Sequence, residues 1–278
     1  MLGALHTLQQ HARLSRVKRV VGTSVGGIIA LLLVAGYHAI EIYRVLEGIG
    51  FAFFDEIDCD SVLMFYDTLG AVDGAPFVRL LRVMLEKKGV AADATFAQLH
   101  ARSGVALGLT GYNVLTSSTE CFSHASHPTM PVLKAARITM SIPLYFRPVE
   151  YAGGLYVDGG LVEPTPVRFC LNKAESIVVA LTCNAYSDSP TTPPLPLQMA
   201  DFVPLLLRGP GRCLHHRCLR LERMYPQSVV NIQITCPDGK SRFMDLEMGV
   251  AEKRRLFELG VAGVRSFLAA REALDTTV

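Results

Sequence analysis

The sequence predicts an α/β fold, with a mostly parallel central sheet and helices on both of its faces. Strand-like and helix-like apolar runs follow one another by turns along the chain, which favours this class. The apolar run 176–182 is typical of a strand in a parallel sheet that is covered on both faces. With 278 residues and 50% hydrophobic content, the chain has enough apolar surface for one large core. We therefore expect a single domain made of a core (1–185), a proline-rich loop (186–197) and a C-terminal helix and strand portion (198–278).

The first element of interest is a strand, turn and helix near the start of the chain. An apolar β-branched pair, 20–21, leads into Gly22-Thr23-Ser24-Val25-Gly26, and the helix-like run 27–35 follows. A serine between two glycines on a sharp strand-to-helix turn is the pattern of a nucleophile elbow. The spacing therefore makes Ser24 a candidate nucleophile.

This turn has chemical consequences for the serine. Ser24 would lie at a helix N-terminus, where the partial positive charge favours an alkoxide or a developing oxyanion. The backbone N–H of Val25 would supply part of an oxyanion hole, with Gly22 and Gly26 allowing close backbone approach. Gly36 suits the C-terminal cap of the same helix.

Other interpretations of this stretch remain open on the residues alone. A phosphate loop is excluded because the Lys-Ser/Thr ending is missing. A membrane span from Val20 to Tyr37 is uncharged and follows three basic residues, but 18 residues is short for a span. The third interpretation is an idle serine in a buried strand, turn and helix, and it stays open until a base is found.

A second motif supplies the base. Tyr156-Val157-Asp158-Gly159-Gly160-Leu161 places a carboxylate at the end of an apolar strand, with two glycines after it. Asp-Gly between hydrophobic runs is more often only a tight turn. Paired with Ser24, however, Asp158 becomes a candidate general base.

The two motifs together resemble the patatin-like phospholipases, whose Gly-x-Ser-x-Gly serine works with the aspartate of an Asp-Gly-Gly or Asp-Gly-Ala motif. The similarity extends through 19–27, 136–149 and 156–167, and it covers most of residues 1–170. Residues 95–99 and the expected strand 112–116 are also similar. Glu163 and Pro164 stand where the family often has asparagine.

The resemblance implies a three-layer α/β fold and a lipid acyl hydrolase of the phospholipase A or lysophospholipase kind. Asp158 would take the proton of Ser24, an acyl-enzyme would form on Ser24, and Asp158 would then activate water, with no metal and no cofactor. The substrate would be a lipid ester drawn from a membrane or lipid-droplet surface. We therefore expect a cytoplasmic protein with peripheral membrane association.

One departure from the family concerns the start of the chain. The family begins with a strand and a Gly-Gly-Gly-x-Arg/Lys-Gly oxyanion loop, and the helix after it resembles 2–8, where this chain starts. Losing one oxyanion donor typically costs ~10²–10³ in turnover. The alternative function is therefore a catalytically inactive patatin-like scaffold that binds lipid or protein, unless the sequence is a fragment or has a misplaced start.

Composition indicates which partners and which cellular compartment the sequence favours. The chain has 27 basic and 25 acidic residues, a formal net charge of +2, which indicates no nucleic-acid partner. Seven cysteines at irregular spacing, without a signal peptide, favour reduced thiols in the cytosol.

The remaining elements follow in chain order. We expect mainly helices over 39–99. The phenylalanines of this region would line an acyl pocket or belong to the core, which is the commoner place for such residues: Phe51, Phe53, Phe54 and Phe77. Strand-like runs lie at 112–116, 176–182 and 229–235, and a final amphipathic helix at 250–271.

Two segments carry weaker functional signals. The basic run from Arg208 to Arg223 would suit an anionic membrane surface, although a solvated helix face is the commoner meaning. Within it, the Cys and His residues of 213–218 fit no familiar zinc spacing, so we expect no metal site.

Overall fold

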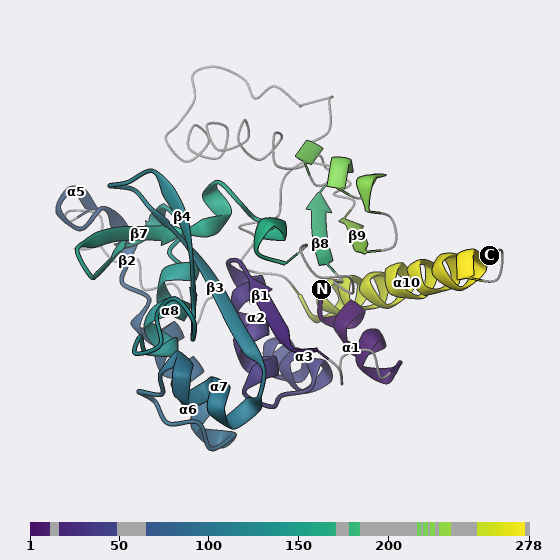
Figure 1. The fold of residues 1–278 in the computed structure, drawn as a ribbon, viewed down its shortest axis with the longest axis horizontal. Helices are drawn as coiled ribbons and strands as arrows, with labels where there is room; N and C mark the ends of the chain where they lie inside the picture. The colour runs from purple at the N-terminus through teal and green to yellow at the C-terminus, as the bar shows by residue number, and fades with distance from the viewer. Residues whose placement is uncertain are drawn as a thin grey trace.

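The computed structural model describes residues 1–11, 17–48, 65–170, 178–183, 216–217, 219–221, 223–225, 228–234 and 249–275. Its central sheet is flanked by helices, so the predicted α/β class is confirmed (Figure 1). The proline-rich loop, the cysteines of 213–218 and the phenylalanines at 51, 53 and 54 lie outside the described residues.

The helices account for most of the regular structure around the sheet. In chain order they are α1 (Leu2–Gln10), α2 (Val25–Val34), α3 (Ala39–Gly48), α5 (Phe65–Thr68), α6 (Ala75–Lys87), α7 (Phe96–Ser103), α8 (Val132–Thr139) and α10 (Val250–Asp275), with short 3₁₀ turns η3 (Gly159–Leu161) and η4 (Val167–Phe169).

The strands form one central sheet and two smaller pairs within the described residues. They are β1 (Arg19–Gly22), β2 (Gly70–Val72), β3 (Ala106–Asn113), β4 (Ser118–Ser123), β5 (Leu144–Phe146), β6 (Val149–Tyr151), β7 (Gly154–Asp158), β8 (Val178–Cys183) and β9 (Val229–Ile234). The five-stranded sheet has the order β1-β3-β7-β6 with β4 on the other edge of β3, and β2 pairs with β5 and β8 with β9.

Strand pairing in the described part of the central sheet is mixed, so the expectation of a mostly parallel central sheet is wrong. β1 runs parallel to β3, while β4 and β7 run antiparallel to it and β6 runs antiparallel to β7. Short connections such as the turn between β3 and β4 produce antiparallel neighbours, whereas β1 reaches β3 only through several helices.

The register of β3 brings the ends of two other strands together. Gly22, the last residue of β1, pairs with Leu109, and Asp158, the last residue of β7, pairs with Gly111. Gly108 to Gly111 also pair with β4, so β1 and β7 share the opposite edge of β3. Because they run in opposite directions along that edge, their C-terminal ends meet on either side of Thr110.

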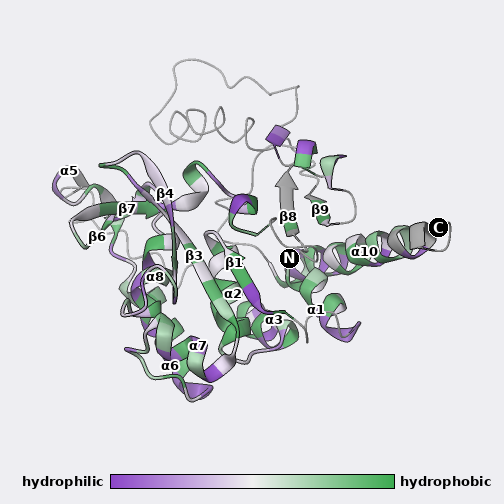
Figure 2. Ribbon diagram, in the orientation of Figure 1, coloured by the Kyte–Doolittle hydropathy of each residue, from purple (hydrophilic) through white to green (hydrophobic). Residues whose placement is uncertain are grey.

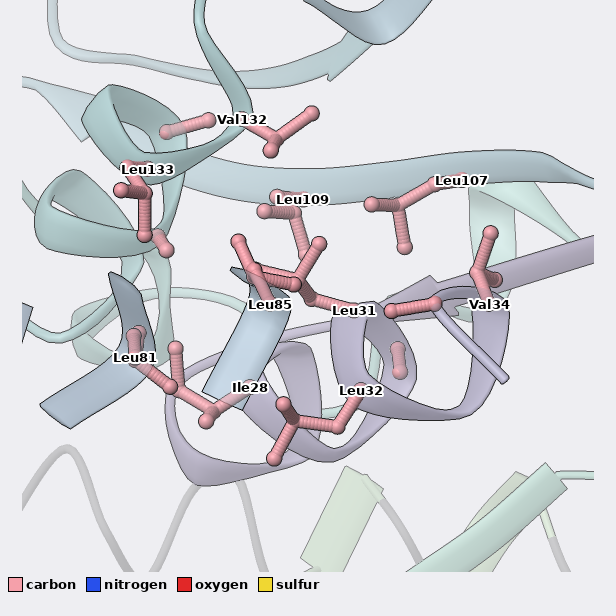
Figure 3. Packing of buried hydrophobic residues seen from close by; sticks show 14 of the residues in the cluster. Ile28, Leu31, Leu32, Val34, Leu81, Leu85, Leu107, Leu109, Val132 and Leu133 are labelled. Carbon is pink, nitrogen blue, oxygen red and sulfur yellow. The ribbon is translucent and has the colours of Figure 1, made fainter. Parts of the chain in front are cut away.

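The main core lies where helices pack against β3. Leu31 of α2 and Leu85 of α6 meet Leu109 of β3, and all three side chains are fully buried (Figure 3). α2 is apolar on every side, as a helix in the interior of a domain must be, and Figure 2 colours it hydrophobic in the middle of the molecule. This core fixes α2, and with it the turn that precedes α2.

A second, smaller core joins the two ends of the described chain. α1 packs across α10, and a Cβ built on Gly260 would lie 2.9 Å from the backbone nitrogen of Ala4, so the two helices touch backbone to backbone. Val230 and Ile232 of β9 pack against Val264 of α10 in the same cluster. The far end of α10 projects from the molecule (Figure 1).

Several sequence predictions are confirmed here and others are corrected. The predicted strand at 229–235 and helix at 250–271 correspond to β9 and α10. The strand predicted at 112–116 is wrong in its bounds, because β3 ends at Asn113 and a turn follows. Phe77 is buried in the main core, which was the commoner of its two expected places.

The apolar run 20–37 is divided between β1 and the ten-residue helix α2. Among the described helices, none is both long enough and apolar enough to cross a membrane.

Candidate active site

Ser24 lies on the sharp turn between β1 and α2. It is the N-cap of α2, with φ 55° and ψ −134°, a backbone region that side chains rarely adopt. A non-glycine residue held there costs on the order of 1–3 kcal/mol, and such strain persists where surrounding contacts enforce it. The predicted elbow geometry is therefore present at this serine.

The glycine before the serine is required by close packing. A Cβ built on Gly22 would lie 2.6 Å from the Cα of Gly27, which real Cβ atoms do not approach. The chain therefore folds β1 back over the first turn of α2 with only glycines in between. Gly36, the predicted cap residue, follows the end of α2 with φ 102°.

Asp158 ends β7 and is 4% exposed. Its Oδ1 accepts a 2.7 Å hydrogen bond from the N–H of Gly160, and its own N–H donates a 2.8 Å hydrogen bond to the carbonyl oxygen of Ser141. These bonds fix the carboxyl on the 3₁₀ turn η3. The expected strand-end aspartate with a glycine turn is what the structure contains.

Ser24 and Asp158 are brought together at the meeting of β1 and β7. Burial raises the pKa of Asp158 to about 7, while hydrogen bonding from the Ser24 hydroxyl and from the Gly160 N–H acts in the opposite direction. Ser24 Oγ is buried, and it forms no hydrogen bond of good geometry with any group in the described part of the chain. The two groups are therefore neighbours whose hydrogen bond is not fully aligned.

Thr110 connects the two halves of the site. Its Oγ1 lies 2.7 Å from Thr23 Oγ1, and the Thr23 hydroxyl is also 3.2 Å from the carbonyl oxygen of Glu163. A Cβ on Gly159 would stand 2.6 Å from Thr110 Oγ1, so the aspartate loop, which is Gly159 and Gly160 directly after Asp158, rests on β3. The three side chains Thr23, Thr110 and Asp158 are all buried.

The start of α2 offers backbone donors beside Ser24. The first helical N–H is that of Gly27, which donates to the carbonyl oxygens of Ser24 at 2.8 Å and of Thr23 at 3.2 Å. The N–H groups of Val25 and Gly26 precede it and have no acceptor within the helix. Val25 is 49% exposed, and the Met1 side chain lies 3.6 Å from a Cβ built on Gly26.

Glu163 is a second buried carboxylate close to the site. It is 3% exposed, its Oε2 forms a 2.7 Å ion pair with Arg168, and its Oε1 is buried without a hydrogen-bond partner among the described residues. Burial raises its pKa, and the charges of Arg168 and Arg217 oppose that rise. Arg217, from the predicted basic run, is thereby near the aspartate loop.

Sequence reasoning missed the polar residues that hold this arrangement: Thr23, Thr110, Thr139, Ser141 and Arg137. Thr23 lies inside the serine motif, and Thr139, Ser141 and Arg137 lie in the segment 136–149 that marks the family resemblance. A buried hydroxyl has no distinct signal in a single sequence, and Thr110 lies outside these motifs altogether.

Features away from Ser24 and Asp158 do not add to the candidate site. A cavity of about 680 Å³ lies between α3 and α10, lined by residues such as Tyr43, Arg44 and Phe257, and neither Ser24 nor Asp158 lines it. Within the residues that the structure describes, no cluster of His, Cys, Asp and Glu side chains is arranged to hold a metal ion.

Comparison with known proteins agrees with the fold and with the family resemblance. The family model for patatin-like phospholipases matches residues 1–171. A probable lipid hydrolase, 463L, of Invertebrate iridescent virus 6 is 24% identical over 176 residues, which are 62% of this chain and 58% of that protein. The chain thus spans less than two thirds of this relative.

Two solved structures share the fold at low sequence identity. VipD from Legionella pneumophila aligns with a TM-score of 0.58 and 12% identity over 97% of this chain and 64% of its own. The type III effector protein ExoU, from Pseudomonas aeruginosa, aligns with a TM-score of 0.54 and 17% identity over 98% of this chain and 50% of its own. The family model covers more than half of the chain, and the chain therefore belongs to the patatin-like phospholipase family.

Proposed function

We propose that this protein is a lipid acyl hydrolase that cleaves carboxylic esters with a Ser24–Asp158 dyad. The observation that carries the proposal is the pairing of a strained serine at a helix N-terminus with a buried aspartate whose pKa burial raises to about 7. An ordinary aspartate, near pKa 3.9, is a weak base toward an alcohol, and a value close to neutral pH suits general base catalysis better.

The proposed reaction has two half-reactions. Asp158 takes the hydroxyl proton of Ser24 as Oγ attacks the ester carbonyl, and the N–H groups of Val25 and Gly26 stabilise the oxyanion. The tetrahedral intermediate breaks its bond to the leaving alcohol, which takes the proton from Asp158. Asp158 then accepts a proton from water as the resulting hydroxide attacks the acyl-enzyme, and Ser24 regains a proton when the fatty acid leaves.

Long-chain lipid esters, phospholipids first, are the proposed substrates, because the chain belongs to the patatin-like phospholipase family and one relative is named a probable lipid hydrolase. Such substrates lie in a lipid surface, so the protein would bind membranes or lipid droplets peripherally. Exposed apolar side chains next to the dyad, Val25 and Val162, would enter that surface. Exposed arginines beside the aspartate loop would attract anionic lipids.

The direct test is hydrolysis of phosphatidylcholine vesicles, with fatty acid release measured by mass spectrometry. We expect release by the wild type and none above background by Ser24→Ala. Ser103→Ala is the matched control, since the Ser103 hydroxyl donates to the Leu99 carbonyl at the end of α7, away from the dyad. A folded wild type that binds the vesicles and releases no fatty acid would contradict the enzyme and favour a lipid-binding scaffold.

Peripheral binding needs its own test. The test is flotation of the Ser24→Ala protein with phosphatidylcholine vesicles, with and without phosphatidylserine. The comparison separates the apolar contribution to membrane binding from the electrostatic one. We expect the protein to float with both and more strongly with the anionic lipid, an increase that salt removes. Absence from the vesicle fraction in both cases would exclude the proposed surface binding.

A further inference from the structure

The end of α8 lies between the two halves of the candidate site. Thr139, the last residue of α8, is fully buried, and its Oγ1 accepts a 2.9 Å hydrogen bond from the backbone N–H of Ser24. Two residues later, the carbonyl oxygen of Ser141 accepts the 2.8 Å hydrogen bond from Asp158 N–H. One short segment therefore holds the backbone of the serine and the backbone of the aspartate.

Thr139 supplies a hydrogen-bond acceptor for the backbone N–H of Ser24. The N–H of Ser24 lies at the helix start, where no helical carbonyl is available to accept it. The backbone of Ser24 is also strained, with φ 55°, and needs surrounding contacts to remain so. The Thr139 methyl group adds packing, since a Cβ on Gly27 would lie 3.0 Å from Thr139 Cγ2.

Arg137 fixes the same segment from the other side. Its guanidinium donates to the carbonyl oxygen of Asp73 at 2.9 Å, to Ser141 Oγ at 2.6 Å and to the carbonyl oxygen of Arg147 at 2.8 Å. The Ser141 hydroxyl in turn donates to the carbonyl oxygen of Arg137 at 2.8 Å. These bonds connect α8, the loop before α6 and the segment that leads to β6.

The guanidinium is also largely removed from water. It lies over the Phe146 ring, 5.2 Å from the ring centroid, and burial lowers its pKa to about 10. A cation largely removed from water is costly unless it is hydrogen-bonded, and here two backbone carbonyls and the Ser141 hydroxyl accept from it. Its removal would leave those carbonyls and Ser141 without their partner.

From these contacts we infer that Thr139 and Arg137 are positioning residues of the dyad: Thr139 holds the nucleophile through its backbone, and Arg137 holds the base through Ser141. The inference rests on the proposed Ser24–Asp158 chemistry and adds two residues to it. Neither side chain touches the reacting atoms. Their effect is on the distance and alignment of two groups whose hydrogen bond is not fully formed at rest.

The test for Thr139 compares three variants of the full chain. Thr139→Val keeps the shape and removes the acceptor, Thr139→Ser keeps the acceptor and removes the methyl group, and Thr7→Val removes another buried hydroxyl, one that donates to Gly3 within α1. Each is assayed for hydrolysis of a long-chain p-nitrophenyl ester and for the rate of fluorophosphonate labelling per folded molecule.

We expect Thr139→Val to lower kcat and the labelling rate about tenfold or more with little change in KM, because alignment of the nucleophile is lost while ground-state binding is kept. Thr139→Ser should recover most of the rate, and Thr7→Val should match the wild type. Wild-type rates in Thr139→Val would overturn the role of Thr139. Equal losses in the valine and serine variants would also overturn it, since packing alone would then explain them.

The test for Arg137 uses the pH dependence of the same labelling. Arg137→Met loosens the segment that buries Asp158, so the midpoint of its pH profile should move below that of the wild type, and the rate should fall. Thr139→Val should leave the midpoint in place, because it acts on the serine. A lower melting temperature in Arg137→Met with unchanged rate and midpoint per folded molecule would overturn its positioning role.

Failure of the dyad and failure of this inference give different results. If Ser24→Ala keeps the activity, or the folded wild type has none, the proposed function is wrong and the inference falls with it. If Ser24→Ala and Asp158→Ala are inactive while Thr139→Val and Arg137→Met match the wild type, the dyad stands and only the inference is wrong.

Discussion

Gly159 rests against the side chain of Thr110: a Cβ built on the glycine would lie 2.6 Å from Thr110 Oγ1 and 3.0 Å from Thr110 Cβ. This contact seats the aspartate loop on β3, at the point where the ends of β1 and β7 meet. The position of Asp158 relative to Ser24 therefore depends on the absence of a side chain at residue 159.

A methyl group at this position should displace the carboxyl of Asp158. We expect Gly159→Ala to lower esterase turnover about tenfold or more, because small misplacements of a reacting group are costly. Gly263→Ala is the control, since its Cβ would meet Ile232 Cγ1 at an ordinary 3.4 Å. A Gly159→Ala protein as active as the Gly263→Ala protein would contradict this account of the loop.

Activity should depend on pH through the carboxyl of Asp158. The pKa of Asp158 is raised to about 7, and only the charged form accepts a proton. The rate of ester hydrolysis should rise with pH through about 7, and one unit below that midpoint it should be about tenfold lower than on the plateau at high pH. A profile that is flat from pH 5 to pH 8 would exclude Asp158 as the base.

The same carboxyl should make the fold less stable as pH rises. Burial raises its pKa from 3.8 to about 7, so between these values the folded state holds a proton that the unfolded state has lost. The contribution of this group to the free energy of unfolding is therefore largest below about pH 4 and falls until about pH 7.

Asp158→Asn removes this titration and keeps an oxygen for the Gly160 N–H. At pH 8 we expect the variant to be more stable than the wild type by ~1–4 kcal/mol, with the difference disappearing near pH 4. Urea unfolding at the two pH values measures it. A difference that does not change with pH would mean that Asp158 is not buried with a raised pKa.

The strain at Ser24 should appear as a difference between two inactive variants. Glycine adopts φ 55° readily and alanine does not, so Ser24→Gly should be more stable than Ser24→Ala by about 1 kcal/mol. Thermal unfolding of the two proteins side by side makes the comparison. An alanine variant at least as stable as the glycine variant would show that the turn is not strained.

Much of the site could be predicted because its chemistry is local in the sequence. Ser24 with its flanking glycines, and Asp158 with the glycines after it, each specify a turn at the end of a strand, and both turns are present. The predicted strand 112–116 begins later in the sequence than β3 (Ala106–Asn113) does. Gly108 and Gly111 interrupt the side-chain pattern of a strand in this stretch, so the pattern does not mark its true start. Both positions are crowded, since a Cβ on Gly111 would overlap Ile138 Cγ2 and a Cβ on Gly108 would lie 2.9 Å from Cys121 Sγ.

The supporting contacts could not be predicted because they join residues far apart in the chain. Thr110 contacts Thr23 across 87 positions, and Thr139 binds the Ser24 N–H across 115. Nothing local distinguishes these threonines from others in apolar surroundings. The register of β1 on β3 brings Thr23 beside Thr110, and the end of α8 brings Thr139 to the Ser24 N–H.

The most direct test of the dyad is labelling of the full chain by a fluorophosphonate probe, which reacts with activated serines. The account predicts labelling of the wild type, none in Ser24→Ala, and a loss of at least about a hundredfold in rate in Asp158→Ala, whose base is missing. Labelling that persists in Ser24→Ala, or a folded wild type that does not react, would contradict it.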